Sequence, residues 1–229
     1  MRVLNIIHSW LKNIYKSINY KYNQTKNCST IEQESKDLRQ RFMSTKGKIR
    51  IIGGQHRGRK VSIVDNVIKP TKDRVRETLF NWLAFQTEGK RCLDLFAGTG
   101  ILGIEALSRG ASDIVFVDHR RKILKEIQKQ ALYLGLENFR VVHSDAQLFL
   151  NDPNCFQPFD LIFLDPPFSG YKIQDFLNHF ESCKWLNPGG FIYYESDQKL
   201  DCKEYSMSWE NYKESKAGNV YYGLLKRKQ

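Results

Sequence analysis

The sequence has little that would support a disulfide framework, a zinc site or a membrane span. Its five cysteines are odd in number, lie far apart and never form a C-x-x-C pair, so neither paired disulfides nor a zinc cluster is expected. The five histidines are equally scattered, without the spacing of a metal site or a catalytic triad. No apolar run approaches the roughly 20 residues that a spanning helix needs. These absences favour a soluble protein of a reducing compartment, the cytoplasm, with no bound metal.

Acidic residues are scarce relative to basic ones. The 36 lysines and arginines exceed the 25 aspartates and glutamates and give a formal net charge of +11. A surface of this charge attracts polyanions, nucleic acid first and anionic membrane second. A merely basic globular protein would have the same balance, so charge alone does not decide function. Hydrophobic residues make up 41% of the 229 residues, which excludes a fully disordered chain and allows one domain with an appendage.

Residues 1–47 differ in composition from the rest and are not expected to belong to the core. No acidic residue precedes Glu32, and apolar residues recur at helical spacing over 3–18 with lysines between them, which predicts a basic amphipathic helix. Three interpretations stay open: an organelle targeting peptide, a surface helix that touches RNA or membrane, and residues translated from an upstream start codon, with Met43 as the functional start. Targeting peptides are typically rich in Arg and Ser, so we rank that interpretation last for a segment rich in Lys and Asn. We expect residues 1–42 to be dispensable for folding and activity.

Residues 48–88 carry the pattern of a short hairpin followed by a helix. Branched apolar residues at 49–52 and 59–64 flank a Gly53-Gly54 turn. Thr71, which follows a proline, is expected to cap the helix. The apolar stripe of that helix consists of Val75, Leu79, Trp82 and Leu83.

Strands and helices alternate beyond residue 89. Short apolar strands between amphipathic helices indicate a parallel sheet covered on both faces. Two weaker signals, over 204–209 and 220–225, predict an antiparallel hairpin at the sheet edge. The stronger strands are predicted over 92–96, 114–117, 140–142, 161–164 and 191–194, and the helices from 101, over 123–134 and over 173–185. We therefore expect three segments, namely an extension over 1–47, a hairpin and helix over 48–88, and an α/β domain over 89–229.

A glycine-rich turn follows the first strand of the α/β domain. Gly98, Gly100 and Gly103 spell G-x-G-x-x-G between a predicted strand and a predicted helix. Asp118 ends the next strand, where an acid can bind ribose hydroxyls. The pattern is typical of a site for an adenosine-bearing cofactor, because glycine lets a ligand approach the backbone closely. A dinucleotide's pyrophosphate favours helix amides with no adjacent anion, whereas the cationic end of S-adenosylmethionine suits a carboxylate, so Asp94 favours the methyl donor.

A second motif, Asp165-Pro166-Pro167-Phe168, follows the fourth predicted strand of the domain. A strand that simply ends in a proline turn would also explain it. However, the motif falls on the sheet edge where the glycine-rich turn lies and where open α/β sheets bind ligands. The exocyclic amine of a base is a poor nucleophile, so positioning it is the main task of an enzyme that methylates it. The Asp165 carboxylate can accept one amine hydrogen while Phe168 stacks on a base that has left its helix.

Four segments, 50–59, 70–81, 93–103 and 165–168, resemble the bacterial 16S ribosomal RNA guanine-N2 methyltransferase family in matching order. The likeness covers about residues 48–226. It implies that Asp118 binds the cofactor ribose, that Asp145 lies near the adenine amino group and that Asp165, Pro166 and Phe168 hold the target base. Asp118 stands where the family commonly has Glu, and residues 1–47 have no counterpart in the family pattern.

The resemblance also gives roles to basic residues of the hairpin, which would grip RNA phosphates, and to Thr71 and Arg74, which would lie beside the catalytic pocket. The candidate cofactor-binding residues are Thr71, Arg74, Asp94, Phe96, Gly98, Gly100, Gly103, Asp118 and Asp145. The candidate RNA-binding residues are His56, Arg57, Arg59, Lys60, Lys72 and Arg76. The candidate catalytic residues are Asp165, Pro166, Pro167 and Phe168.

These observations predict a Rossmann-like class I methyltransferase fold of the α/β class, with a seven-stranded, mostly parallel sheet, an antiparallel edge hairpin and a small N-terminal hairpin and helix. The expected reaction transfers a methyl group from S-adenosylmethionine to guanine N2 of small-subunit ribosomal RNA, either naked or in a partly assembled particle. A cytoplasmic monomer with no membrane partner is expected. An adenine-N6 methyltransferase on RNA or DNA, a non-catalytic RNA-binding assembly protein and a nicotinamide oxidoreductase stay open as alternatives.

Overall fold

The computed structural model describes residues 47–63, 71–152, 156–168, 170–201 and 208–228. Thr45–Gln229 group into one compact unit. The predicted helix over 3–18 lies outside the described residues, as does most of the strand predicted over 204–209. No helix of the described segments is long and apolar enough to cross a membrane.

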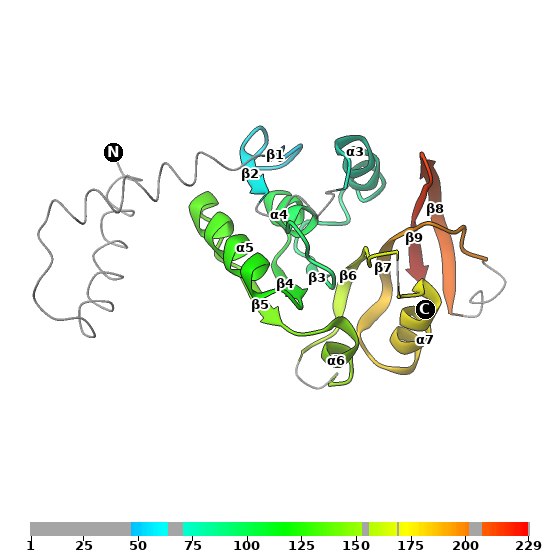
Figure 1. The fold of residues 1–229 in the computed structure, drawn as a ribbon. Coiled ribbons are helices and arrows are strands. Elements are labelled where there is room, and N and C mark those ends of the chain that lie inside the picture. Colours follow the sequence, from blue (N-terminus) through cyan, green and yellow to red (C-terminus); the bar gives the residue numbers. More distant parts are fainter. Residues whose placement is uncertain (1–46, 64–70, 153–155, 169, 202–207, 229) are drawn as a thin grey trace, which may run out of the picture. The chain divides into compact units, whose positions relative to one another are not determined.

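A seven-stranded sheet forms the centre of this unit, in the order β5-β4-β3-β6-β7-β9-β8 (Figure 1). Strands β3 to β7 are parallel, and β9 and β8 follow as an antiparallel pair at one edge. The strands are β3 (Arg91–Asp94), β4 (Asp113–Asp118), β5 (Phe139–His143), β6 (Phe159–Leu164), β7 (Leu186–Ser196), β8 (Trp209–Ala217) and β9 (Val220–Arg227). The predicted fold is confirmed, and the described part of the first edge strand is Trp209–Ala217, which begins at the last residue of the stretch predicted over 204–209.

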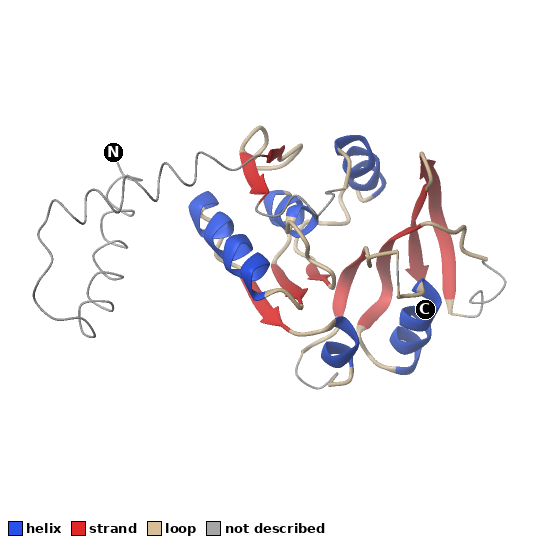
Figure 2. Ribbon diagram, viewed as in Figure 1, coloured by secondary structure: helices blue, strands red, loops and turns tan. Residues whose placement is uncertain are grey.

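Helices cover both faces of the sheet (Figure 2). Alternate strand residues face opposite sides, as in any strand: Cys92 and Ile114 pack into one apolar cluster, and Leu93 and Val115 into the other. The first cluster includes the hairpin β1 (Gly47–Arg50) and β2 (Lys60–Ile63) and the helices α3 (Asp73–Trp82), α4 (Ile101–Ser108) and α5 (Arg121–Leu134). The second includes α6 (Ala146–Leu150) and α7 (Ile173–Ser182).

The chain reverses direction across the sheet at β3. It runs from β3 outward to β4 and β5 and then returns to β6 on the other side of β3. In open α/β sheets, ligands bind outside the carboxyl ends of the strands at such a switch point. The carboxyl ends of β3, β4, β6 and β7, which we call the catalytic rim, are therefore where a site is expected.

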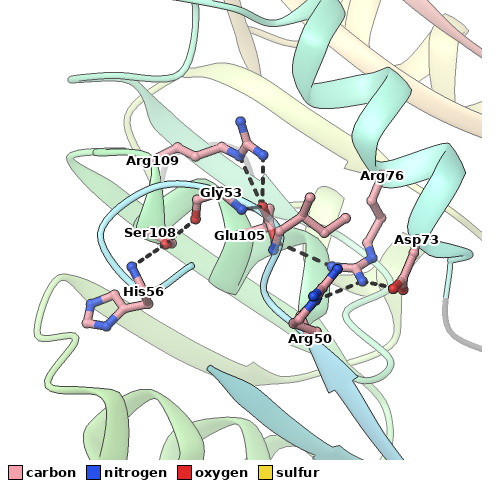
Figure 3. Close-up of polar contacts among 9 residues, drawn as sticks. Arg50, Gly53, His56, Asp73, Arg76, Glu105, Ser108 and Arg109 are labelled. Carbon is pink, nitrogen blue, oxygen red and sulfur yellow. Dashed lines mark hydrogen bonds and ion pairs between the residues drawn. The ribbon is translucent and has the colours of Figure 1, made fainter. Parts of the chain in front are cut away.

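A buried carboxylate fastens the N-terminal hairpin and α3 onto α4. The side chain of Glu105 is fully buried and accepts hydrogen bonds from the backbone amides of Ile52 and Gly53 at 2.9 and 2.7 Å. The guanidinium groups of Arg76 and Arg109 contact the same carboxylate at 3.3 and 3.0 Å (Figure 3). All of α4 is buried beneath these contacts, which explains why its sequence is apolar apart from this acid and the terminal Ser108.

Candidate active site

The glycine-rich turn joins β3 to α4 at the catalytic rim. Gly100 has a φ of 74° at the helix N-cap, and a Cβ there would lie 2.8 Å from Ile127 of α5. Gly103 has a different role, because a Cβ on it would lie 2.3 Å from the Phe116 ring. Gly103 is buried inside the core and lets α4 pack closely against β4, so its glycine is explained by packing and not by contact with a cofactor.

Asp94 ends β3 beneath this turn. Its side chain is buried and accepts a hydrogen bond from the amide of Gly103 at 3.3 Å. Burial raises the pKa of Asp94 to about 7, the Gly103 hydrogen bond opposes this rise, and the charge of Asp118 adds to it. A cation bound beside Asp94 would favour its ionised form, which is the property expected of a site for a positively charged ligand.

Asp118, at the end of β4, is buried and fully engaged within the protein. One carboxylate oxygen accepts hydrogen bonds from the Gly98 amide and the Arg120 Nη2, both at 3.0 Å. The other accepts from the Arg120 amide and Nε at 2.8 and 3.0 Å. A carboxylate has about four acceptor positions, so ribose hydroxyls can bind Asp118 only by replacing the Arg120 guanidinium.

Asp145 caps α6 and also contacts an aromatic side chain. Its Oδ1 accepts hydrogen bonds from the amides of Gln147 and Leu148 at 2.8 and 3.3 Å, and its Oδ2 accepts one from the Tyr171 hydroxyl at 2.9 Å. Partial burial raises the pKa of this carboxyl, but the Tyr171 and backbone hydrogen bonds outweigh it, so the pKa is lowered overall. The Tyr171 ring lies 5.1 Å from that of Phe96. Sequence analysis missed Tyr171, which stands three residues after Phe168.

The Asp165 motif lies at the end of β6, beside the end of β7. Leu164 pairs with Tyr194 across these parallel strands, so the next residues, Asp165 and Glu195, are neighbours at the rim. Burial, the charge of Glu195 and that of Asp94 raise the pKa of Asp165 well above its ordinary value. Pro166 is buried, whereas Pro167 and Phe168 are exposed, Phe168 by 48%.

Thr71 contacts both carboxylates of this pair. Its side chain is hydrogen-bonded to Asp165 and to Glu195, and the Tyr193 hydroxyl donates to Glu195 Oε1 at 2.8 Å. The prediction that Thr71 caps α3 is wrong: Lys72 occupies the N-cap without a side-chain hydrogen bond, and the Thr71 side chain is hydrogen-bonded to the two carboxylates instead. Tyr193 and Glu195 were not predicted. Their signal was available, because the carboxyl end of a parallel strand adjacent to β6 must lie at the same rim.

The basic residues assigned to RNA binding differ in accessibility. Arg57, Arg59, Lys60 and Lys72 are exposed, as is Arg74, and His56 is partly exposed. Burial and the neighbouring Arg59 lower the pKa of His56. These side chains are accessible to solvent, and their binding of RNA stays a prediction.

The prediction that Arg76 binds RNA is wrong. Its side chain is fully buried, and its guanidinium contacts Glu105, Asp73 and the carbonyl of Arg50, the last two at 2.7 and 3.0 Å (Figure 3). A phosphate cannot reach it without opening the core. Arg76 instead compensates the buried charge of Glu105 and so stabilises the contact between α3 and α4.

Comparison with known proteins places the chain in a family. A family model described as conserved hypothetical protein 95 matches residues 49–226. The chain is 41% identical over 185 residues to ribosomal RNA small subunit methyltransferase D of Escherichia coli, over 80% of this chain and 92% of that protein. The protein of the same name from Haemophilus influenzae is 38% identical over 186 residues, which cover 79% of this chain and 95% of that protein. A solved putative methyltransferase from Escherichia coli has a TM-score of 0.70 at 40% identity and covers 80% of this chain and 99% of that chain. The chain therefore belongs to the conserved hypothetical protein 95 family, together with these relatives.

Proposed function

We propose that this protein is an S-adenosylmethionine-dependent methyltransferase that acts on the N2 amine of a guanine in small-subunit ribosomal RNA. One observation carries the proposal: the glycine-rich turn and the Asp165 motif, which are far apart in sequence, lie at the ends of the paired strands β3 and β6. The relatives named for methylation of small-subunit ribosomal RNA support the RNA class.

The charges at the rim fit a cationic methyl donor better than a dinucleotide. Asp94 and Glu195 both raise the pKa of Asp165, so three carboxylates share one small region. A pyrophosphate would add negative charge there, whereas a cation would relieve the repulsion. When bound, S-adenosylmethionine supplies a methyl group that its sulfonium already activates. Asp94 would stabilise the cationic end, and Asp118 would bind the ribose after release of Arg120.

We propose different protonation states for Asp165 and Glu195. The Thr71 hydroxyl carries one proton, so it can donate to only one of the two carboxylates that it contacts. Burial raises the pKa of both carboxyls, so a proton on one of them would relieve their mutual repulsion. We propose that, when the target base is bound, the proton lies on Glu195 and Thr71 donates to Asp165, because the reaction needs an acceptor at Asp165. Asp165 is then ionised and can accept a hydrogen from the target amine.

This arrangement suits the needs of the reaction. Asp165 orients the N2 amine toward the methyl group, and Phe168 offers a ring on which the extruded base can stack. As the bond from N2 to the methyl carbon forms, the bond from that carbon to sulfur breaks. The amine then loses one proton to Asp165, so the nitrogen does not remain positively charged.

Two measurements test the proposal. S-Adenosylhomocysteine should raise the melting temperature of the protein and NAD should not, because only the former fits the acidic rim. Incubation of unmodified 16S ribosomal RNA and of small subunits with labelled S-adenosylmethionine should place the label in N2-methylguanosine. Label in N6-methyladenosine would favour the adenine enzyme, and thermal stabilisation by NAD alone would favour an oxidoreductase.

A further inference from the structure

The loop between β1 and β2, which carries the exposed arginines, lies at the far end of α4 and α5 from the catalytic rim. The Gln55 amide donates to the carbonyl of Ser108, the last residue of α4, at 2.6 Å. Arg59 donates to the carbonyl of Leu134, the last residue of α5, at 3.3 Å. Both helices begin at the rim, α5 only three residues after Asp118. Because α5 has 14 residues, it is about 20 Å long at ~1.5 Å per residue. An RNA that reaches both the rim and this loop must cross the intervening surface.

A basic stripe occupies that surface. Lys122, Lys125, Lys129 and Tyr133 follow one another at steps of three and four residues, which places them along one side of α5. All four are exposed, Tyr133 by 76%. The single acid of the helix, Glu126, is half-buried and lies 3.8 Å from the Lys129 Nζ.

The basic residues of α5 are not placed where they would stabilise this helix. Cations favour the C-terminal end of a helix and acids its first turn, because of the helix dipole. In α5 the first turn carries Arg121 and Lys122 and no acid, and the last turn carries no basic residue. The exposed sides of the other long helices on the described surface are not basic in this way: α3 mixes acids with bases, and α7 exposes Asp175 and Glu181.

The stripe is continuous with the hairpin through direct contacts. The Ser62 amide donates to the Gln130 side chain at 2.6 Å, and that side chain donates back to the Ser62 carbonyl at 2.8 Å. The Arg59 guanidinium lies 5.5 Å from the centre of the Tyr133 ring. The hairpin cations are therefore held in a fixed relation to those of α5.

We infer that Lys122, Lys125 and Lys129, with Tyr133 and Arg59 at the far end, form a binding track for the RNA phosphate backbone that runs from the rim to the hairpin loop. The inference rests on the proposed function, because it is the methylation site that brings RNA to the rim. β3 separates β4 from β6, so the end of β4, three residues before the start of α5, lies about 10 Å from the end of β6 at ~4.8 Å per strand. A strand whose target base enters beside Asp165 can thus reach the first turn of α5 within a short length of backbone.

The test compares two triple variants of equal charge. Lys122→Gln/Lys125→Gln/Lys129→Gln removes the track and keeps the helix propensity, because Gln and Lys are similar in this respect. The control, Lys184→Gln/Lys213→Gln/Lys216→Gln, removes the same charge from exposed positions beyond α7 and on β8, at the opposite edge of the sheet. Binding of unmodified 16S ribosomal RNA is measured against salt concentration, with methyl transfer and S-adenosylhomocysteine affinity measured in parallel.

We expect the track variant to bind RNA more weakly and with a shallower slope of log K against log salt. The slope should change by about 0.7 to 0.9 per lost phosphate contact, hence by about 2 to 3 in total. The control should keep a slope close to that of the wild type, and both variants should keep the affinity for S-adenosylhomocysteine. Equal slopes for the track variant and the control would overturn the track even if the wild type methylates RNA. A reduced slope in the track variant with no methylation by the wild type would leave the track standing and overturn the proposed function.

Discussion

Three side chains at the ends of two strands and before α3 are connected by hydrogen bonds at the catalytic rim. Asp165 and Glu195 both contact the Thr71 hydroxyl, so they cannot both be ionised and both accept a hydrogen bond from it. Tyr193 donates to Glu195 and has its pKa raised well above the ordinary value by burial and by the two carboxylates, so its phenol remains a donor. In the proposed arrangement this chain of hydrogen bonds ends at Asp165.

Asp165→Ala should abolish most of the turnover and leave cofactor binding nearly unchanged, because this carboxylate serves the base amine. A charged hydrogen bond made mainly in the transition state contributes about 1.5 to 3 kcal/mol, so a tenfold to hundredfold loss of rate is the minimum expected. Single-turnover methylation and calorimetry with S-adenosylhomocysteine measure the two effects separately. Turnover near that of the wild type would remove Asp165 from the mechanism.

Glu195→Gln should retain turnover within a few-fold, whereas Glu195→Ala should lose about tenfold or more. The carboxamide reproduces protonated Glu195, because its NH₂ can donate to Thr71 while its oxygen accepts from Tyr193. Alanine breaks the chain and leaves Tyr193 without this acceptor. Turnover from pH 6 to 9 measures both variants. A loss in the Gln variant as large as in the Ala variant would show that Glu195 must be ionised, contrary to our assignment.

Two elements connect the rim to the rest of the fold. The glycine-rich turn brings Asp94 and Asp118 together, since the amides of Gly103 and Gly98 donate to their carboxylates. The hairpin is fastened to α4 by Glu105 (Figure 3). α4 is therefore in contact with the glycine-rich turn at its start and with the hairpin along its length.

Arg76→Ala should destabilise the protein by about 3 kcal/mol, the lower end of the range for breaking a buried ion pair, because Glu105 keeps Arg109 and two backbone amides. Urea denaturation measures the change in free energy of unfolding. The matched control is Arg57→Ala, which removes an exposed arginine and should stay within about 0.5 kcal/mol. A similar small effect for both arginines would contradict the role given to the buried pair.

Binding of S-adenosylmethionine should strengthen as the pH rises from 6 to 8. Asp94, whose pKa burial raises to about 7, must lose its proton to pair with the cationic end, so affinity should rise by about tenfold over this interval. Calorimetry measures it, and Asp94→Asn is the control, because it keeps only the ligand's own titration. A pH dependence that is the same in both proteins would exclude Asp94 as the cationic partner. Without ligand, the folding stability that Asp94 contributes changes with pH in the opposite direction. The pKa of Asp94 in the folded protein exceeds the unfolded value of 3.8, so the stability that it contributes at low pH is lost as the pH rises toward 7.

At the scale of the whole molecule, the architecture could be predicted because its signals are local. Apolar strands, amphipathic helices and the glycine-rich turn each occupy a short stretch of sequence, and the parallel sheet follows from their alternation. Asp94 and Asp118 each end a strand and Asp165 directly follows one, and parallel strands bring such ends to one edge. Residues 1–46 lie outside the described structure, so the dispensability of residues 1–42 stays a prediction.

Pairings across long sequence separations could not be predicted in the same way. Arg76 was assigned to RNA binding because nothing local indicates its partner Glu105, 29 residues later. The sequence did contain one signal of this ion pair, because a single acid in a largely apolar helix is expected to be buried and to need a buried partner. The Thr71 hydroxyl was assigned to a helix cap for a similar reason, because its true partners are 94 and 124 residues away.

The central claim, methylation of guanine N2 in small-subunit ribosomal RNA, is tested most directly in cells that lack this protein. Mass spectrometry of nuclease fragments of their small-subunit ribosomal RNA should show that one guanosine has lost its N2-methyl group. Return of the intact gene should restore the modification, and return of the Asp165→Ala form should not. An unchanged set of N2-methylguanosines, or the loss of an N6-methyladenosine instead, would contradict the account.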